Sequence, residues 1–265
     1  MKIIGEKING TRKHVAKAIV ERDVDVIRAL ARKQTEAGSS WLDVNAGTHP
    51  RREPDDLVWL VETVQTAVDT PLCLDSTNPQ AIAAALEVID RTPMINSISG
   101  EPDRLASILP LVAAHACCVI ALAMDATKIP DTSAGRVAVI DKVMAATRAA
   151  GVPDAHIYVD PLVLAVGTDT CSGRIFLETL RAVRTAYPAV HTTAGLSNIS
   201  FGLPVRSYIN RAFLTLALAA GLDSAILDPL DQGLRATLLA AELVLGRDEY
   251  GLAYTRAYRA GVFDK

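Results

Sequence analysis

The feature that most constrains this chain is an alternation of short apolar runs with helical patterns, repeated eight times. Apolar runs separated by amphipathic helices are typical of parallel strands that are covered by helices on the outside. The repeats follow one another at roughly 20 to 40 residues, and together they have about the length of one (β/α)8 barrel. The expected strands are Lys2–Ile8, Trp41–Gly47, Pro71–Thr77, Pro93–Ser99, Cys117–Met124, His156–Val163, Val190–Ser197 and Ser224–Leu230.

Apolar residues at helical spacing predict a helix after each expected strand. Asn78 and Pro79 suit the cap and first position of one of them. A doubly wound open sheet is the main alternative, but its usual glycine-rich first turn is missing, because the first turn here reads GEKINGTR. The expected helices are Val24–Ala37, Asp55–Val68, one beginning at Asn78, Asp103–His115, Ser133–Ala150, Gly173–Ala186, Tyr208–Ala220 and Leu234–Leu245. The sequence therefore predicts an α/β protein with one TIM-barrel domain over 1–265.

Composition narrows the class of protein further. Half of the residues are hydrophobic but only 5% are aromatic, so the core must consist mostly of Ala, Val, Leu and Ile. A net charge of −3 argues against a nucleic-acid binder that works by broad phosphate neutralisation. No apolar run is long enough for a membrane span and no signal-peptide pattern opens the chain, so we expect a cytoplasmic protein. The four cysteines lack metal-ligand spacing, and we expect them to be small core residues.

Polar residues recur where the expected strands end, and the active site of a TIM barrel lies at that end of its strands. For Ser76, Asp125 and Asp228, capping of the following helix explains the polar residue as well as a role in the active site does. For Asp75, Asn96, Asp160 and Asn198 the convergence of four separate strands on one mouth favours a binding role. The residues at strand ends are Glu6, Lys7, Asn9, Asp43, Asn45, Asp75, Ser76, Asn96, Ser97, Asp125, Asp160, Ser197, Asn198 and Asp228.

The types of residue at these ends restrict the chemistry. No histidine ends a strand, which argues against a histidine-based metal site and against a Ser-His-Asp triad. No lysine lies inside a later strand to form a Schiff base. Carboxylates and amides suit the N–H/NH₂ edge of a ring such as guanine or pterin. We therefore expect a site that holds a polar heterocycle by hydrogen bonds and contains no metal.

Seven segments resemble the pterin-binding methyltransferases, which move a methyl group between tetrahydrofolate and a corrinoid. The resemblance runs in order over essentially the whole chain. It implies the barrel shared by dihydropteroate synthase and by the folate domain of cobalamin-dependent methionine synthase. The segments are GEKIN, LDVNAG, LCLDSTN, MINSIS, YVDPLV, GLSNISFGLP and INRAFL.

The resemblance also implies roles for individual residues. Asn198 and Asp75 would be catalytic: Asn198 would hydrogen-bond N5 of the folate as charge develops there, and Asp75 with water would complete a proton path. Arg206 would meet the aminobenzoate–glutamate tail. The residues expected around the pterin ring are Asp75, Asn96, Asp160, Gly195, Ser197 and Asn198.

The same resemblance bears on substrates and partners. Phe201, Gly202 and Leu203 stand where some corrinoid iron–sulfur protein methyltransferases are more polar, so the chain looks more like the branch that serves glycine betaine or O-demethylase systems. Tetrahydrofolate or methyltetrahydrofolate would be a substrate, and a homodimer is implied. Too few residues follow the last expected helix for a cobalamin-binding module. The corrinoid (cobalamin) is therefore expected as a co-substrate, free or on a separate protein, and not permanently bound.

The sequence is also compatible with two other functions. A dihydropteroate-synthase-like ligase would use the same fold and related pterin-holding groups. It would also need a catalytic-site lysine and a basic pyrophosphate grip near the eighth strand, whereas that strand ends in LDPLDQG. A non-catalytic folate-binding barrel within a corrinoid system is the third possibility.

Overall fold

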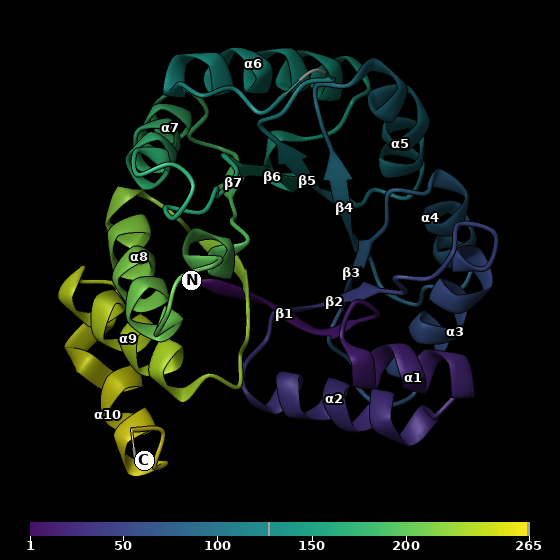
Figure 1. Ribbon diagram of the computed structural model, residues 1–265, viewed down its shortest axis with the longest axis horizontal. Helices are drawn as coiled ribbons and strands as arrows, with labels where there is room; N and C mark the ends of the chain where they lie inside the picture. Colours follow the sequence, from purple (N-terminus) through teal and green to yellow (C-terminus); the bar gives the residue numbers. More distant parts are fainter. Residues whose placement is uncertain (127, 264–265) are drawn as a thin grey trace.

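The computed structural model describes residues 1–126 and 128–263, and within them eight parallel strands form one sheet that curls into a barrel (Figure 1). The strands neighbour one another in the order β7-β6-β5-β4-β3-β2-β1-β8. The remaining gap is bridged where the backbone N–H of Ile226 donates to the carbonyl of Ala194 at 2.9 Å. The predicted (β/α)8 barrel is therefore confirmed. The strands are β1 (Lys2–Asn9), β2 (Trp41–Asn45), β3 (Leu72–Asp75), β4 (Met94–Ile98), β5 (Cys118–Leu122), β6 (Ile157–Asp160), β7 (His191–Thr192) and β8 (Ser224–Leu227).

Helices surround the barrel as an outer ring (Figure 1). Side-chain caps fix the starts of several helices, and the cap at Asn78 was predicted from the sequence. The side chain of Asn78 accepts from the backbone N–H of Gln80 at 3.0 Å, and Pro79 follows as the first helical residue. The helices are α1 (Lys13–Glu21), α2 (Val24–Glu36), α3 (Glu53–Gln65), α4 (Pro79–Leu86), α5 (Pro102–Ala114), α6 (Ser133–Ala149), α7 (Ser172–Ala186), α8 (Arg206–Ala220), α9 (Gln232–Val244) and α10 (Leu252–Arg259), with 3-10 turns η1 (Asp154–His156), η2 (Leu196–Ser200) and η3 (Glu249–Gly251).

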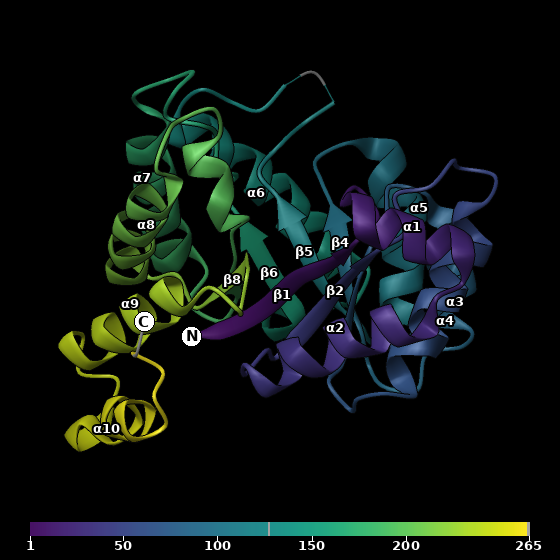
Figure 2. The ribbon, with the colours of Figure 1, turned by 60° about the horizontal axis from the view of Figure 1, so that its bottom comes forward.

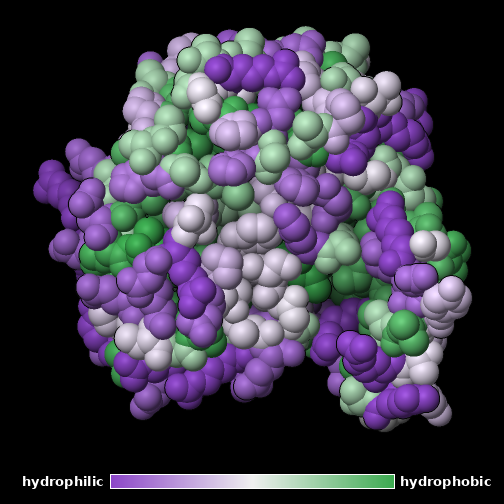
Figure 3. Space-filling model, turned by 180° about the vertical axis from the view of Figure 1, so that it is seen from behind, coloured by the Kyte–Doolittle hydropathy of each residue, from purple (hydrophilic) through white to green (hydrophobic). Residues whose placement is uncertain are grey.

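Two helices were not predicted. Helix α1 follows Arg12, whose side chain makes no cap, and ends at Arg22, which takes a left-handed φ of 55° without being glycine. The usual sequence signals for a helix start and end are therefore missing. Helix α10 buries none of its side chains. It lies outside the ring and forms a separate lobe of the space-filling surface (Figures 1 and 3).

The expected seventh strand, Val190–Ser197, is wrong in its second half. Only His191–Thr192 pairs as β7, and the chain then turns into η2. Two contacts explain the turn: Leu196 is fully buried in the core under α8, and the carbonyl of Ser197 accepts from Nη2 of Arg206 at 2.7 Å. Asn198 therefore lies on a turn at the barrel mouth and not at the end of a straight strand.

The barrel interior is filled by a small set of side chains, with a larger aliphatic core between strands and helices. Cys73 and Cys117 are buried as expected, but Cys118 is partly exposed and Cys171 is exposed, so the core assignment is wrong for Cys171. In the part of the chain that the structure describes, no helix is both long and apolar enough to cross a membrane. The interior set consists of Ile4, Cys73, Met94, Ile120 and Tyr158.

Candidate active site

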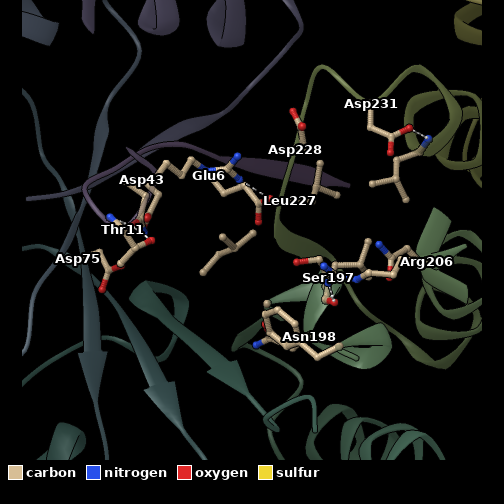
Figure 4. A pocket seen from close by; sticks show the side chains of 18 of the residues that line it. Glu6, Thr11, Asp43, Asp75, Ser197, Asn198, Arg206, Leu227, Asp228 and Asp231 are labelled. Carbon is tan, nitrogen blue, oxygen red and sulfur yellow. Dashed lines mark hydrogen bonds and ion pairs between the residues drawn. The ribbon is translucent and has the colours of Figure 1, made fainter. Parts of the chain in front are cut away.

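A cavity of 610 Å³ opens at the mouth of the barrel, where the carboxyl ends of the strands meet. In Figure 2 these strands point toward the upper side of the molecule, and α10 lies at the opposite end. Figure 4 shows Asp43 and Asp75 on one side of the cavity, Glu6 near its middle, and Ser197 and Arg206 on the other side. The lining includes Glu6, Asn9, Thr11, Arg12, Asp43, Asp75, Asn96, Gly195, Leu196, Ser197, Asn198, Phe201, Arg206, Ser207, Asn210, Ile226, Leu227, Asp228, Asp231 and Leu234.

Most of the residues that the sequence predicted for the site meet in this one cavity. They come from β3, from β4, from the segment between β7 and α8 and from the first residue of α8, so only the folded barrel brings them together. Asp160 is not among the lining residues. The predicted residues that line the cavity are Asp75, Asn96, Gly195, Ser197, Asn198 and Arg206.

Two carboxyl groups from neighbouring strands form one wall. Nδ2 of Asn45 donates to Oδ2 of Asp75 at 2.9 Å, and Nδ2 of Asn96 donates to Oδ1 of Asp43 at 3.4 Å. Burial raises the pKa of Asp43 well above its usual range, and the charge of Asp75 raises it further. Burial likewise raises the pKa of Asp75. This wall can therefore hold a proton as well as accept hydrogen bonds.

Asp160 is the last residue of β6 and is not among the residues that line the cavity. Its Oδ1 accepts from the backbone N–H of Leu162 at 2.7 Å. Burial raises the pKa of Asp160 to about 6, although hydrogen bonds from the backbone of Leu162 and Gly195 act in the opposite direction. The carboxyl thus supports the backbone of Gly195, which does line the cavity. Its predicted contact with a pterin ring stays a prediction.

The side chain of Asn198 lies free at the opposite wall. None of the residues that the structure describes hydrogen-bonds its amide, while its backbone carbonyl accepts from Phe201 N–H at 3.2 Å. A Cβ atom on Gly195 would come within 3.0 Å of Nδ2 of Asn198. Glycine at position 195 therefore leaves the room that this amide occupies. An amide held without a protein partner at a cavity wall can hydrogen-bond a ligand.

A partly buried network of hydrogen bonds holds the turn that carries Asn198. Arg206 donates from Nε to Oγ of Ser200 at 2.9 Å and from Nη2 to the carbonyl of Ser197 at 2.7 Å. Ser200 in turn hydrogen-bonds Oδ1 of Asn210 at 2.7 Å. Arg206 thus uses two of its nitrogens to position η2, a role that the sequence did not predict. Its predicted contact with the tail of folate stays a prediction.

A charged region completes the cavity near β1 and β8. Lys7 forms an ion pair with Asp228, and Arg12 pairs with Glu6 at 3.2 Å. Burial raises the pKa of Glu6, which Arg12 partly offsets. The Oδ1 atom of Asp228 also accepts from Leu230 N–H at 3.0 Å, so this carboxylate fixes the turn after β8.

Two other strand-end residues bind the loop that follows their strand, but neither caps a helix, because the caps of α4 and α6 are Asn78 and Thr132. Oγ of Ser76 accepts from Asn78 N–H at 2.9 Å and donates to Glu53 at 2.6 Å. Oδ1 of Asp125 accepts from the backbone N–H of Ala126 at 2.8 Å. Neither residue lines the cavity.

Sequence reasoning assigned no role to Asp43, Glu6 or Asn210. Asp43 and Glu6 follow apolar runs, so the signal of a polar strand end was present for both. Asn210 lies inside α8, where no sequence signal marks it as a cavity residue. Among the described residues, no three His, Cys, Asp or Glu side chains are grouped as a metal site would require.

Comparison with known proteins agrees with this geometry. Residues 5–228 match the family described as pterin binding enzyme. The chain is 38% identical over 263 residues to a methylcorrinoid:tetrahydrofolate methyltransferase of Eubacterium limosum, covering 98% of this chain and 97% of that relative. It is 33% identical over 237 residues to the methionine synthase of Mycobacterium tuberculosis, of whose length the match covers only 20%.

Solved structures show the same fold at lower sequence identity. The 7,8-dihydropteroate synthase of Vibrio fischeri superposes with a TM-score of 0.71 at 16% identity, covering 93% of both chains. The DHPS of Yersinia pestis gives a TM-score of 0.70 at 17% identity, covering 92% of this chain and 93% of that one. These likenesses concern the barrel alone. Because the family pattern spans most of the chain and the full-length relative shares more than a third of its residues, the chain belongs to the family of pterin-binding enzymes.

Proposed function

We propose that this protein is a methyltransferase that moves a methyl group from a methylcorrinoid to N5 of tetrahydrofolate, within a single domain spanning 1–265. The observation that carries the proposal is the meeting of Asp75, Asn96 and Asn198 in one cavity. The near full-length likeness to a methylcorrinoid:tetrahydrofolate methyltransferase supports the substrates and this direction of transfer. The setting would be one-carbon metabolism that removes methyl groups from a donor compound.

The proposed reaction is an in-line SN2 displacement at the methyl carbon. The lone pair of N5 attacks the methyl carbon while the cobalt–carbon bond breaks, and cobalt keeps the bonding electron pair as Co(I). N5 becomes a cationic tertiary amine and then loses its proton. In the opposite direction the proton must be supplied first, because a tertiary amine is a poor leaving group.

Asn198 is proposed to hydrogen-bond the substrate at N5. An amide is too weak an acid to donate the proton itself, but its hydrogen bond strengthens as charge develops on N5. Asp75, whose pKa is raised by burial, is suited to take up and release the proton through water. Both groups would then act on the reacting nitrogen.

The wall of Asp43, Asp75 and Asn96 is proposed to hold the pterin ring. A carboxylate beside an amide matches the N–H/NH₂ edge and carbonyl of such a ring. Asp160 would support the same ring through Gly195 or contact it directly once ligand binds, and Ser197 would line the adjoining loop. Arg206 remains the candidate for the aminobenzoate–glutamate tail.

Absorbance of the corrinoid tests the reaction directly. The protein is mixed with methylcob(III)alamin and tetrahydrofolate, and separately with cob(I)alamin and methyltetrahydrofolate. Conversion between the two cobalamin spectra that depends on the protein is expected. Bound folate without conversion would instead indicate a non-catalytic folate-binding barrel. Formation of dihydropteroate from a dihydropterin pyrophosphate and p-aminobenzoate would indicate the ligase.

We also propose a cytoplasmic homodimer that receives its corrinoid as a free molecule or on a separate protein. An apolar groove between α7 and α8, lined by residues such as Leu177, Ile209 and Leu216, supports a contact with a second copy. Cysteines that form no disulfide support a reducing compartment. Light scattering after size exclusion gives the mass in solution, and a monomer at micromolar concentration would contradict the dimer.

A further inference from the structure

The guanidinium of Arg104 joins two parts of the backbone at the mouth of the barrel. Arg104 lies in the first turn of α5, and each of its three side-chain nitrogens donates to a backbone carbonyl. Nε donates to the carbonyl of Ser97, near the end of β4, at 2.7 Å. Nη1 donates to Thr77 at 2.8 Å and Nη2 to Ser76 at 2.7 Å, both in the loop after β3. One side chain therefore ties the end of β4 to the loop that follows β3.

These contacts lie next to two residues of the proposed site. Ser76 follows Asp75 in the chain, and Ser97 follows Asn96. Asp75 and Asn96 are partners in the pairing of β3 with β4, and the backbone N–H of Ser76 donates to the carbonyl of Asn96 at 3.2 Å. Arg104 therefore holds the backbone beside both of these cavity residues.

Arg104 also brings a positive charge close to Asp75. Burial raises the pKa of Asp75 and the charge of Glu53 raises it further, whereas the hydrogen bond from Asn45 and the charge of Arg104 lower it. Asp43 on the neighbouring strand is a second acidic group, whose own pKa is raised by burial and by the charge of Asp75. Arg104 therefore favours the carboxylate form of Asp75 against its acidic neighbours.

The stability of α5 does not account for this arginine. The N-terminal end of a helix carries a partial positive charge, so a cation in the first turn is unfavourable there. The three hydrogen bonds of Arg104 go to residues outside α5. The arrangement thus serves the ends of β3 and β4 and not the helix itself.

A second arginine repeats this arrangement at β6. Arg136, which is 1% exposed near the start of α6, donates from Nη1 to the carbonyls of Pro161 and Leu162 at 2.8 and 2.7 Å. These two residues directly follow Asp160, and the charge of Arg136 opposes the rise that burial causes in the pKa of this carboxyl. Leu162 takes a left-handed φ of 68°, a strained conformation that its surroundings must hold. An arginine bound to the backbone beside an acidic strand end therefore occurs twice at the mouth.

We propose that Arg104 is a positioning residue of the pterin site, which sets the spacing between Asp75 and Asn96 and keeps Asp75 available as a hydrogen-bond acceptor. This inference rests on the proposed function. A pterin ring is rigid and flat, so the groups that bind its edge must be held at a fixed separation. A protonated Asp75 would offer less acceptor capacity to the N–H groups of the ring.

Arg104→Met and Arg104→Lys separate the two parts of this role. Methionine removes both the charge and the hydrogen bonds, whereas lysine keeps the charge but cannot reproduce the planar set of donors. The matched control is Arg184→Met at the base, because Nη1 of Arg184 also donates to a backbone carbonyl, that of Val190, at 2.8 Å. The Kd of tetrahydrofolate is measured by titration at several pH values, and urea unfolding checks that each variant folds.

Arg104→Met is expected to raise the Kd of tetrahydrofolate about tenfold at neutral pH, within the range of coupling between residues of one hydrogen-bond network. On acidification its affinity should begin to fall at a higher pH than that of the wild type, because Asp75 binds a proton more readily without the cation. Arg104→Lys should show the wild-type pH dependence with an intermediate Kd. Arg184→Met should match the wild type in both.

A wild-type Kd in Arg104→Met, or a raised Kd with the wild-type pH dependence, would overturn the proposal, and so would an equal loss in Arg184→Met. If Arg104→Met does not fold, a wild-type Kd in Arg104→Lys would overturn it instead. The titration involves no turnover. Binding of tetrahydrofolate by the wild type without conversion of methylcobalamin would therefore contradict the proposed function and leave the result for Arg104 standing.

Discussion

The two ends of the barrel carry similar polar side chains, but these side chains differ in how fully protein partners hydrogen-bond them. At the base, Nζ of Lys2 donates to the hydroxyl of Tyr158 at 2.8 Å, and the ring of Tyr158 stacks on His191 at 4.6 Å between centres. Nδ1 of His191 lies 3.0 Å from Oδ2 of Asp223, whose Oδ1 accepts from Thr192 N–H at 2.8 Å. Each of these groups has a protein partner.

At the mouth, by contrast, polar groups are buried without full compensation. The pKa values of Glu6, Asp43, Asp75 and Asp160 are all raised, with burial as the first cause. Figure 4 shows the amide of Asn198 extending from its turn toward the open cavity. The comparison teaches that the base is built for stability, whereas the mouth gives up stability to keep groups available for a ligand.

Removing a large side chain at the base should have the largest effect on the free energy of unfolding. Tyr158→Ala removes a ring that is 1% exposed inside the barrel, and the cavity should lower the free energy of unfolding by about 3–5 kcal/mol. Urea unfolding followed by circular dichroism measures the change. The folded fraction should keep the wild-type KM for tetrahydrofolate. An unchanged free energy of unfolding in Tyr158→Ala would contradict the structural role proposed for the base.

Replacing an aspartate by asparagine should raise the free energy of unfolding at the mouth and lower it at the base, both at neutral pH. The pKa of Asp160 is about 6 in the fold, above its ordinary 3.8, so the folded state binds the proton more tightly than the unfolded state does. The resulting stabilisation is present in full below pH 4 and is lost as the pH rises through 6, amounting to about 3 kcal/mol. Asp160→Asn should remove this pH dependence and raise stability relative to wild type at pH 7.

Asp223→Asn at the base is the matched comparison. It weakens the contacts with His191 and Thr192 and should lower stability by about 1 kcal/mol at pH 7. Unfolding free energies at pH 5 and pH 7 measure both variants. Equal losses for the two substitutions would contradict the difference between the ends.

Removing the free amide should affect rate and not stability. Asn198→Ala is expected to slow methyl transfer by roughly 10²-fold, the scale of one preorganised hydrogen bond in a transition state. The thermal midpoint should change little, because the amide has no protein partner among the described residues. Gln80→Ala, an exposed amide outside the cavity, serves as control. A wild-type rate in Asn198→Ala would exclude its catalytic role.

Removing the hydroxyl of Ser200, which supports this turn, should slow the reaction less than removing the amide of Asn198 does. Ser200→Ala breaks the contacts of Ser200 with Arg206 and Asn210 and should reduce kcat by about tenfold, because Asn198 is then held less firmly. Folate Kd from titration should stay close to wild type. A change in Kd equal to the change in kcat would mean that Ser200 supports binding in general rather than the position of Asn198.

Much of the molecule could be predicted because it depends on local pattern. Apolar runs and helical spacing located eight strands and most helices, and the polar residues at the strand ends indicated Asp75 and Asn96 as site residues. Helix α1 was missed because neither Arg12 nor Arg22 carries the usual signal of a helix end. The second half of the predicted strand Val190–Ser197 was wrong, because the turn there is held by α8, a contact that the local pattern does not contain.

The sequence by itself determined the barrel, its order and the polar character of the strand ends, since hydrophobic periodicity acts over a few residues. Only the tertiary structure decided which polar groups meet. It brought Asp43 beside Asn96, left Asp160 out of the cavity lining, and used Arg206 and Asn210 to hold the turn of Asn198. Closing a sheet puts residues that are far apart in the chain at hydrogen-bonding distance, and burial then alters their protonation; neither effect can be read from residues taken one at a time.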